Sequence, residues 1–159
     1  MKTFMQFLKE KVDLKSNDSQ KILLEMLATL FAARWVHHNS HWKEKGENFY
    51  GNHLLFQRIY ESIDAEIDGL AEKIVAFFGE KAINQLDVIK NASQWVEKWN
   101  LESTFKNSIA AEQDLQRIFQ QAYNSLKENK DVSLGLDDFI MATANAHETN
   151  LYLLQQANS

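Results

Sequence analysis

The sequence contains no cysteine and no proline, and only five of its 159 residues are glycine. The absence of cysteine excludes disulfide bonds, thiolate nucleophiles and cysteine-ligated metal sites, so any metal must bind to nitrogen or oxygen. Proline breaks helices and glycine weakens them, so the scarcity of both favours long helices. Hydrophobic residues make up 45% of the chain, which is typical of a globular domain rather than a disordered segment.

The chain also lacks a positive charge balance and a long apolar run. Its net charge of −5 argues against a strongly basic nucleic-acid binder and suits a protein that gathers cations. No apolar run reaches the roughly 18 residues that a membrane span needs. The first sixteen residues mix lysine and glutamate with scattered apolar residues, without the continuous apolar core of a secretory signal. We therefore expect a cytoplasmic protein with no membrane partner.

Apolar residues recur at helical spacing and predict four long helices, at about 19–43, 49–78, 101–128 and 136–156. A lead-in over residues 1–18 precedes them, and Gly79 is a natural C-terminal stop for the second helix. A short extra helix is expected around 83–89, followed by Trp95 and Trp99, which are interpreted only as apolar packing. One long connection between the second and third helices is typical of a ferritin-like four-helix bundle. The fold prediction is therefore an all-α bundle over residues 19–159.

Four of the five histidines cluster where the first two long helices meet. They are His37, His38, His41 and His53, whereas His147 lies in the last helix. His37 and His38 are interpreted as ordinary helix C-terminal residues, which the helix dipole favours, and His147 as a core or surface histidine. No histidine has a glutamate three residues before it. This pattern argues against a di-iron site of the Glu-x-x-His kind inside one bundle.

The second long helix is rich in carboxylates, which are Glu61, Asp64, Glu66, Asp68 and Glu72. Asp68 and Glu72 are one helical turn apart, so both can reach one point. Their phase on the helix is nearly opposite that of the apolar stripe that contains Ile63, Ile67, Leu70 and Ile74. Two interpretations remain: a solvated acidic face, or a face directed at another subunit.

Spacing decides whether these carboxylates can meet the histidines. Fifteen residues separate His53 from Asp68, which is about 22 Å along a helix, too far for one metal site. The groups could meet if two chains pack antiparallel through their first two helices. His41 and His53 of one chain would then face Asp68 and Glu72 of the other. Imidazole with carboxylate, without thiolate, suits iron(II), manganese or zinc.

Two segments resemble the signature of the Dps proteins, which are miniferritins named as DNA-binding proteins from starved cells. They are HNSHWKEKGENFYGNH, residues 38–53, and DGLAEKI, residues 68–74. The resemblance implies a shell of twelve subunits with ferroxidase sites at twofold interfaces. It assigns the ligands to His41, His53, Asp68 and Glu72, and places Trp42 beside the site. A further acidic residue of some members falls on Gln57 here, so a second iron is expected to bind weakly or through water.

The resemblance also implies a function. The site would oxidise two Fe(II) ions with hydrogen peroxide or oxygen, and the shell would store the ferric mineral and protect against oxidative damage. Iron would enter through acidic threefold pores, for which Asp131, Asp137 and Asp138 are candidates; helix capping is the alternative role for them. The alternative function is a DNA-binding, nucleoid-compacting protein with secondary metal binding. Five lysines against three acids in residues 1–21 give that alternative little support.

Overall fold

The computed structural model describes residues 17–159, so most of the predicted lead-in over residues 1–18 lies outside the described part of the chain. Its last two residues begin the first long helix. The elements are α2 (Asn17–Lys43), α3 (Phe49–Phe78), the short 3₁₀ turn η1 (Glu80–Ala82), α4 (Gln85–Lys98), α5 (Thr104–Glu128) and α6 (Leu134–Ala157). Every element in residues 17–159 is helical, which confirms the all-α prediction.

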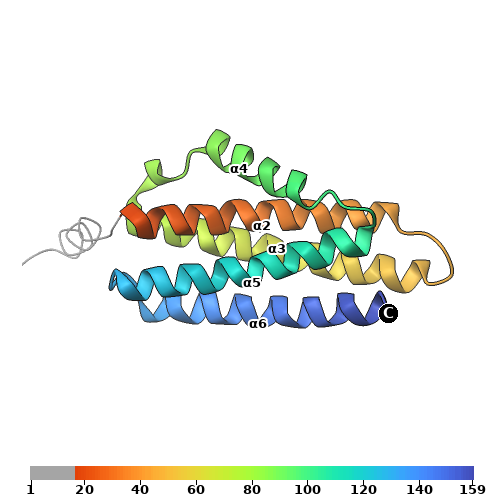
Figure 1. Cartoon of the computed structure of the whole chain (residues 1–159). Coiled ribbons are helices and arrows are strands. Elements are labelled where there is room, and N and C mark those ends of the chain that lie inside the picture. Colours follow the sequence, from red (N-terminus) through yellow and green to blue (C-terminus); the bar gives the residue numbers. More distant parts are fainter. Residues whose placement is uncertain (1–16) are drawn as a thin grey trace, which may run out of the picture.

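The four long helices lie side by side, and α4 crosses the outside of α2 (Figure 1). Helix α2 packs against α3, α5 and α4, while α6 packs against α5 and α3. Because α4 carries the chain back along the bundle, α3 and α5 run in the same direction and α2 and α6 run in the other (Figure 1). This is a four-helix bundle with one long crossover connection.

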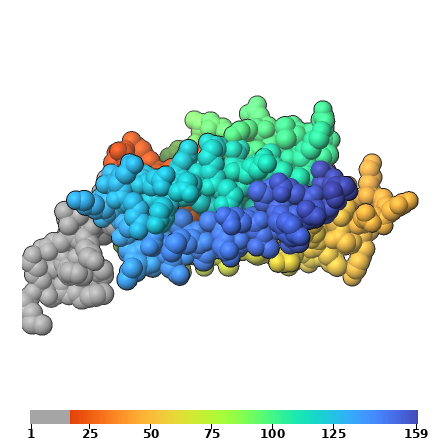
Figure 2. Space-filling model, turned by 60° about the horizontal axis from the view of Figure 1, so that its bottom comes forward, coloured from red at the N-terminus to blue at the C-terminus, as the bar shows by residue number. Residues whose placement is uncertain are grey.

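The second long helix, α3, agrees with its predicted bounds, and its C-terminal end carries a clear signal. Gly79 has a φ of 88°, a conformation that suits glycine, and its N–H donates to the carbonyl of Val75 at 2.8 Å. Its buried stripe consists of Phe56, Ile59, Ile63, Leu70 and Ile74. The loop between α2 and α3 projects beyond the C-terminal end of α6. The space-filling view of the face formed by α5 and α6 shows this projection (Figure 2).

Helix α4 is longer than the sequence predicts, and tryptophan side chains hold it on the bundle. Trp95 Nε1 donates to Glu25 Oε1 of α2 at 2.9 Å. Trp99 Nε1, just after α4, donates to Asp114 Oδ2 of α5 at 2.8 Å. Trp99 is only 1% exposed. Both residues therefore pack as expected, and each also makes a polar anchor that apolar patterning does not reveal.

None of the helices in residues 17–159 is long and apolar enough to cross a membrane.

Candidate functional site

His41 and His53 meet at the end of the bundle where α2 ends and α3 begins. Their rings stack with centroids 3.6 Å apart. His41 Nδ1 lies 2.8 Å from the backbone carbonyl oxygen of His53, and His53 Nδ1 lies 2.9 Å from that of His41. A carbonyl oxygen only accepts hydrogen bonds, so both Nδ1 atoms carry the proton. When such a ring is neutral, its Nε2 carries no proton and has a free lone pair. A metal ion binds an imidazole nitrogen in this state.

The connection between the two helices holds this pair in place. Asn52 Nδ2 donates to Glu44 Oε2 at 3.1 Å, and Thr104 of α5 donates to Glu44 Oε1 at 2.6 Å. Gly46 supplies the turn with a φ of 97°, where a larger side chain would be strained. The histidine pair is therefore built on helix ends fixed by the bundle and not on a free loop.

Asp68 and Glu72 lie elsewhere on α3 and do not reach the histidines of their own chain. Both are exposed. Their separation from His53 along α3 is about 22 Å for Asp68 and more for Glu72. As the side chains are placed in residues 17–159, no three histidine, aspartate or glutamate residues surround a point that could hold a metal ion. One chain therefore carries a pair of imidazoles and, separately, a pair of carboxylates, which the prediction treats as an imidazole half-site and a carboxylate half-site.

Aromatic side chains surround the imidazole half-site. Trp42, 55% exposed, has its ring centroid 4.1 Å from that of His38, which stacks on Tyr60 at 4.1 Å. Arg34 donates to His38 Nδ1 at 3.1 Å, so this ring accepts there. Partial burial, followed by the charge of Arg34, lowers the pKa of His38. His38 is thus a neutral packing residue next to His41, at 6.1 Å between ring centroids.

Gln57 lies one turn after His53 on α3. Its Nε2 donates to Glu61 Oε1 at 2.8 Å. Gln57 is an amide at the position where the resemblance would place an acid. The nearest acid on the same helix, Glu61, is hydrogen-bonded to that amide.

Between the two half-sites lies an exposed apolar surface on α2, α3 and α4. A hollow of about 530 Å³ is lined there by Phe31, Trp35, Ile67, Ile89 and other residues. Trp35 is 50% exposed and Ile89 65% exposed. Apolar patches of this kind are typical of surfaces that contact another protein.

The predicted pore residues lie around the turn between α5 and α6. Asp131 is 3% exposed, Asp137 lies 3.6 Å from Lys127 Nζ, and Asp138 is exposed. The cap of α6 is Ser133, whose Oγ accepts from the N–H of Leu136 at 3.2 Å. The side-chain cap of this helix is therefore a serine, and none of the three aspartates fills that position.

A second group of ionisable side chains, which the sequence patterns did not reveal, lies in the bundle core. His37, Glu112 and His147 are fully buried, and Glu66 reaches His147 from α3. The sequence does contain a sign that two of them are buried. His147 has the same helical phase as the buried residues Leu136, Ile140 and Leu154, and Glu112 has nearly that of the buried Leu115. The assignment of His147 to the core or surface is resolved in favour of the core.

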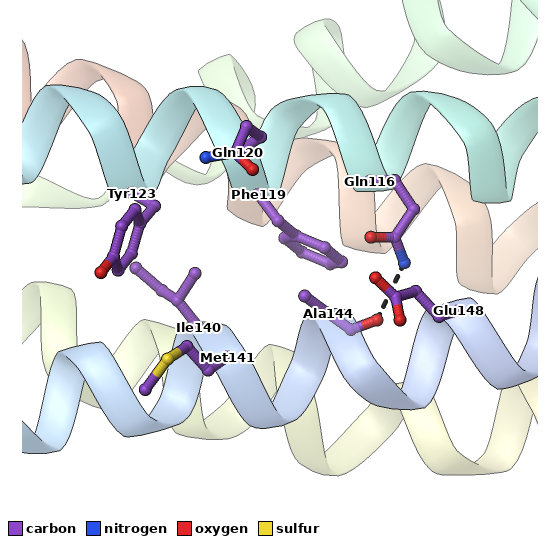
Figure 3. A pocket seen from close by; sticks show the side chains of 8 residues that line it. All are labelled: Gln116, Phe119, Gln120, Tyr123, Ile140, Met141, Ala144 and Glu148. Atoms are coloured by element: carbon purple, nitrogen blue, oxygen red, sulfur yellow. Dashed lines mark hydrogen bonds between the residues drawn. The ribbon is translucent and has the colours of Figure 1, made fainter.

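The groove between α5 and α6 has a different character (Figure 3). Its volume is about 250 Å³ and its walls include Phe119, Tyr123, Ile140 and Met141. Gln116 Nε2 donates to the carbonyl of Ala144 across it at 2.8 Å. No histidine lines this groove and Glu148 is its only carboxylate, so its donor set does not suit iron.

Comparison with known proteins identifies the family to which this fold belongs. The family model of the ferritin-like domain matches residues 20–156. General stress protein 20U of Bacillus subtilis is 34% identical over 56 residues, which cover 35% of this chain and 39% of that protein. A DNA protection during starvation protein of Helicobacter pylori is 27% identical over 97 residues, or 59% of this chain and 67% of that protein. The match therefore spans about two fifths of the first relative and two thirds of the second.

Solved structures show the same fold. Dps from Thermosynechococcus elongatus superposes with a TM-score of 0.75 at 21% identity, covering 99% of this chain and 96% of that one. A Dps protein from Vibrio cholerae, described as a member of a broad superfamily of ferritin-like diiron-carboxylate proteins, gives a TM-score of 0.74 at 17% identity, covering 89% of each chain. With a family model matched over most of its length, the chain belongs to the ferritin-like domain family, and its resemblance to the Dps proteins within that family is confirmed.

Proposed function

We propose that this protein oxidises Fe(II) at sites shared between two subunits and stores the ferric product inside a shell, as a miniferritin. The observation that supports the proposal most strongly is the pair of half-sites. His41 and His53 present unprotonated Nε2 atoms at one end of the bundle. Asp68 and Glu72 present exposed carboxylates further along α3, with Asp68 about 22 Å from His53. A twofold axis that packs α2 and α3 against their copies would bring each half-site to the other.

The chemistry follows from the donor types. Neutral imidazole nitrogen binds Fe(II) well, and carboxylate oxygen favours the harder Fe(III), so the mixed set assists oxidation. Two Fe(II) ions give one electron each to hydrogen peroxide, and with two protons they yield two Fe(III) ions and two water molecules. Oxygen is the alternative oxidant. Because both electrons come from a pair of iron ions, no hydroxyl radical needs to be released.

The two iron positions are unequal in this proposal. His41, His53, Asp68 and Glu72 supply ligands for the first ion, with Trp42 beside it. Gln57 offers a neutral amide where an acid would help to hold the second ion, and that amide is engaged with Glu61. The second ion is therefore expected to bind more weakly, through water or through a rearranged Glu61.

Assembly is part of the function. The apolar surface that includes Phe31, Trp35 and Ile89 lies between the half-sites, where a twofold partner would cover it. A twofold contact is self-complementary, so each dimer forms two equivalent sites. The proposed state is a homo-oligomer of twelve chains whose pores, lined by acids such as Asp138, admit iron.

The test measures ferric absorbance after anaerobic Fe(II) loading and addition of peroxide. The variant Asp68→Asn with Glu72→Gln keeps side-chain size and changes two exposed groups, so it is expected to fold and assemble normally. We expect its initial oxidation rate to fall by about 10- to 100-fold because the carboxylate ligands are lost. Glu97→Gln, an exposed carboxylate of α4, is the matched control. A wild-type rate in the double variant would contradict the proposed site.

A further inference from the structure

The segment that separates the two histidines of the imidazole half-site has a polar contact on its buried side. Among residues 42–52, all of which the structure describes, Glu44 and Asn52 are partly buried and the others are exposed. These two side chains bond to each other, because Asn52 Nδ2 donates to Glu44 Oε2 at 3.1 Å. Two polar side chains thus form the buried part of this segment.

Glu44 extends this contact to a third helix. Thr104, the first residue of α5, donates from its Oγ1 to Glu44 Oε1 at 2.6 Å. The backbone carbonyl of Thr104 also accepts from Ser40 Oγ at 3.3 Å. These two contacts lie on either side of His41 in the sequence. The start of α5 therefore holds the end of α2, where this histidine lies.

The first turn of α3 depends on the same contact. The side chain of its N-cap residue, Asn48, makes no capping hydrogen bond. Because the first N–H groups of a helix have no partner within it, an end without a side-chain cap frays more easily. Asn52 lies in this turn, one residue before His53. Its bond to Glu44 therefore ties down the turn that leads to the second histidine.

The positions of the two backbone segments decide which imidazole nitrogen is free. Each ring lies with Nδ1 against the carbonyl of the other residue, at 2.8 Å for His41 and 2.9 Å for His53. These reciprocal bonds need both carbonyl groups within reach, although twelve residues separate the histidines. If the segments move apart, a neutral ring can carry its proton on Nε2 instead, and that nitrogen then has no lone pair for a metal ion.

We propose that Glu44 is a positioning residue for the imidazole half-site. By joining Thr104 of α5 to Asn52 of α3, its carboxylate keeps both histidine Nε2 atoms free for Fe(II). Ligands that are arranged before the ion arrives bind it at a lower cost in conformational entropy. The effect of Glu44 on iron binding rests on the proposed function, whereas its effect on the rings is a property of the metal-free protein.

A carboxylate near the site could also act by its charge alone, which attracts Fe(II) whatever holds the carboxylate. The two roles differ in their dependence on Thr104. Thr104→Val removes the hydroxyl donor, keeps the shape and leaves the charge of Glu44 in place, whereas Thr104→Ser keeps the donor. Positioning therefore predicts that Thr104→Val disturbs the rings and that Thr104→Ser does not.

The first measurement uses the assembled, metal-free protein with ¹⁵N-labelled histidine, at about pH 8, where an ordinary imidazole is neutral. Solid-state NMR of the sedimented protein distinguishes rings protonated on Nδ1 from rings protonated on Nε2. We expect His41 and His53 to be protonated on Nδ1 in the wild type, and partly on Nε2 in Glu44→Ala and Thr104→Val. Thr104→Ser and Glu47→Ala, which changes an exposed acid of the same loop, should keep the wild-type spectrum.

The second measurement is the initial rate of Fe(II) oxidation as a function of Fe(II) concentration. In Glu44→Ala and Thr104→Val we expect the half-saturating Fe(II) concentration to rise by about 10-fold, the lower end of the effect of residues that orient metal ligands. The rate at saturating Fe(II) should stay close to that of the wild type, because the ligands around the bound ion are the same. Circular dichroism and gel filtration check that each variant is folded and assembled.

Wild-type ring protonation in Glu44→Ala and Thr104→Val would overturn the inference, as would a Thr104→Ser spectrum that matches that of Thr104→Val. An unchanged iron dependence in variants whose rings have changed would overturn the role in iron binding. If Glu44→Ala does not fold, the two Thr104 variants decide. If the rings respond as expected but the wild-type protein oxidises no iron, the proposed function fails and the positioning of the rings stands.

Discussion

At the scale of single residues, the side chains of Glu112 and His147 depend on each other for their charge. Their contact at 2.6 Å lies in the bundle core, where an isolated ion would be costly. Replacing either residue removes the shorter of the other's two charged contacts, and leaves Glu112 beside His37 alone or His147 beside Glu66 alone. Replacement of His147 by alanine is accordingly expected to cost about 3–5 kcal/mol of stability.

The same pair predicts how stability depends on pH. The pKa of Glu112 falls from an ordinary 4.5 to about 2, so its contribution is present above pH 4.5 and is lost as pH falls towards 2. The pKa of His147 rises from 6.5 to about 10, so its contribution is full below pH 6.5 and is lost as pH rises towards 10. Urea unfolding with a chelator present, at one protein concentration, should show stability falling outside pH 4.5–6.5. The control is Glu112→Gln, whose profile should be flatter at both ends; a wild-type profile in that variant would contradict the assignment.

The sequence predicted the interface ligands more readily than the core network, for a physical reason. The spacing along the sequence between the four predicted ligands matches the Dps signature; they are His41, His53, Asp68 and Glu72. The structure brings the two histidines together. Their joint role as ligands stays a prediction. The histidine partners of Glu112 belong to two other helices. A pattern within one stretch of sequence cannot show that these three side chains contact one another in the fold. Apolar periodicity identifies core positions by their hydrophobicity and therefore overlooks ion pairs that occupy the same phase.

At the scale of elements, α3 was predicted to its end residues, whereas α4 was not. Helix α3 has a long apolar stripe and a glycine stop, which are strong signals. Helix α4 buries only Val88 and Ala92 within its span and depends on tertiary anchors. Asn84 caps it by accepting from the N–H groups of Leu86 and Asp87, a signal available in the sequence but weaker than a full stripe.

The anchors of α4 can be separated into packing and hydrogen bonding. Trp99→Phe keeps a large ring in the buried position but removes the donor to Asp114, so we expect a loss of about 1 kcal/mol in the free energy of unfolding. Trp99→Ala should lose about 3–5 kcal/mol because it also leaves a cavity. Urea denaturation followed by circular dichroism measures both. Equal losses in the two variants would show that the hydrogen bond, and not the ring, holds α4.

At the scale of the whole molecule, the proposed activity belongs to a pair of chains, and mixing of variants can test this directly. One chain carries His41→Ala with His53→Ala, and the other carries Asp68→Asn with Glu72→Gln. Each variant alone should be inactive. In a mixed dimer the intact histidines of one chain face the intact carboxylates of the other, which restores one of its two sites. Random co-assembly in equal amounts should therefore recover about a quarter of the wild-type ferroxidase rate, since about half of the dimers are mixed. A site contained within one chain would recover nothing, so the absence of recovery in co-assembled shells would rule out the shared site, and mass spectrometry of the shells confirms that both chains are present.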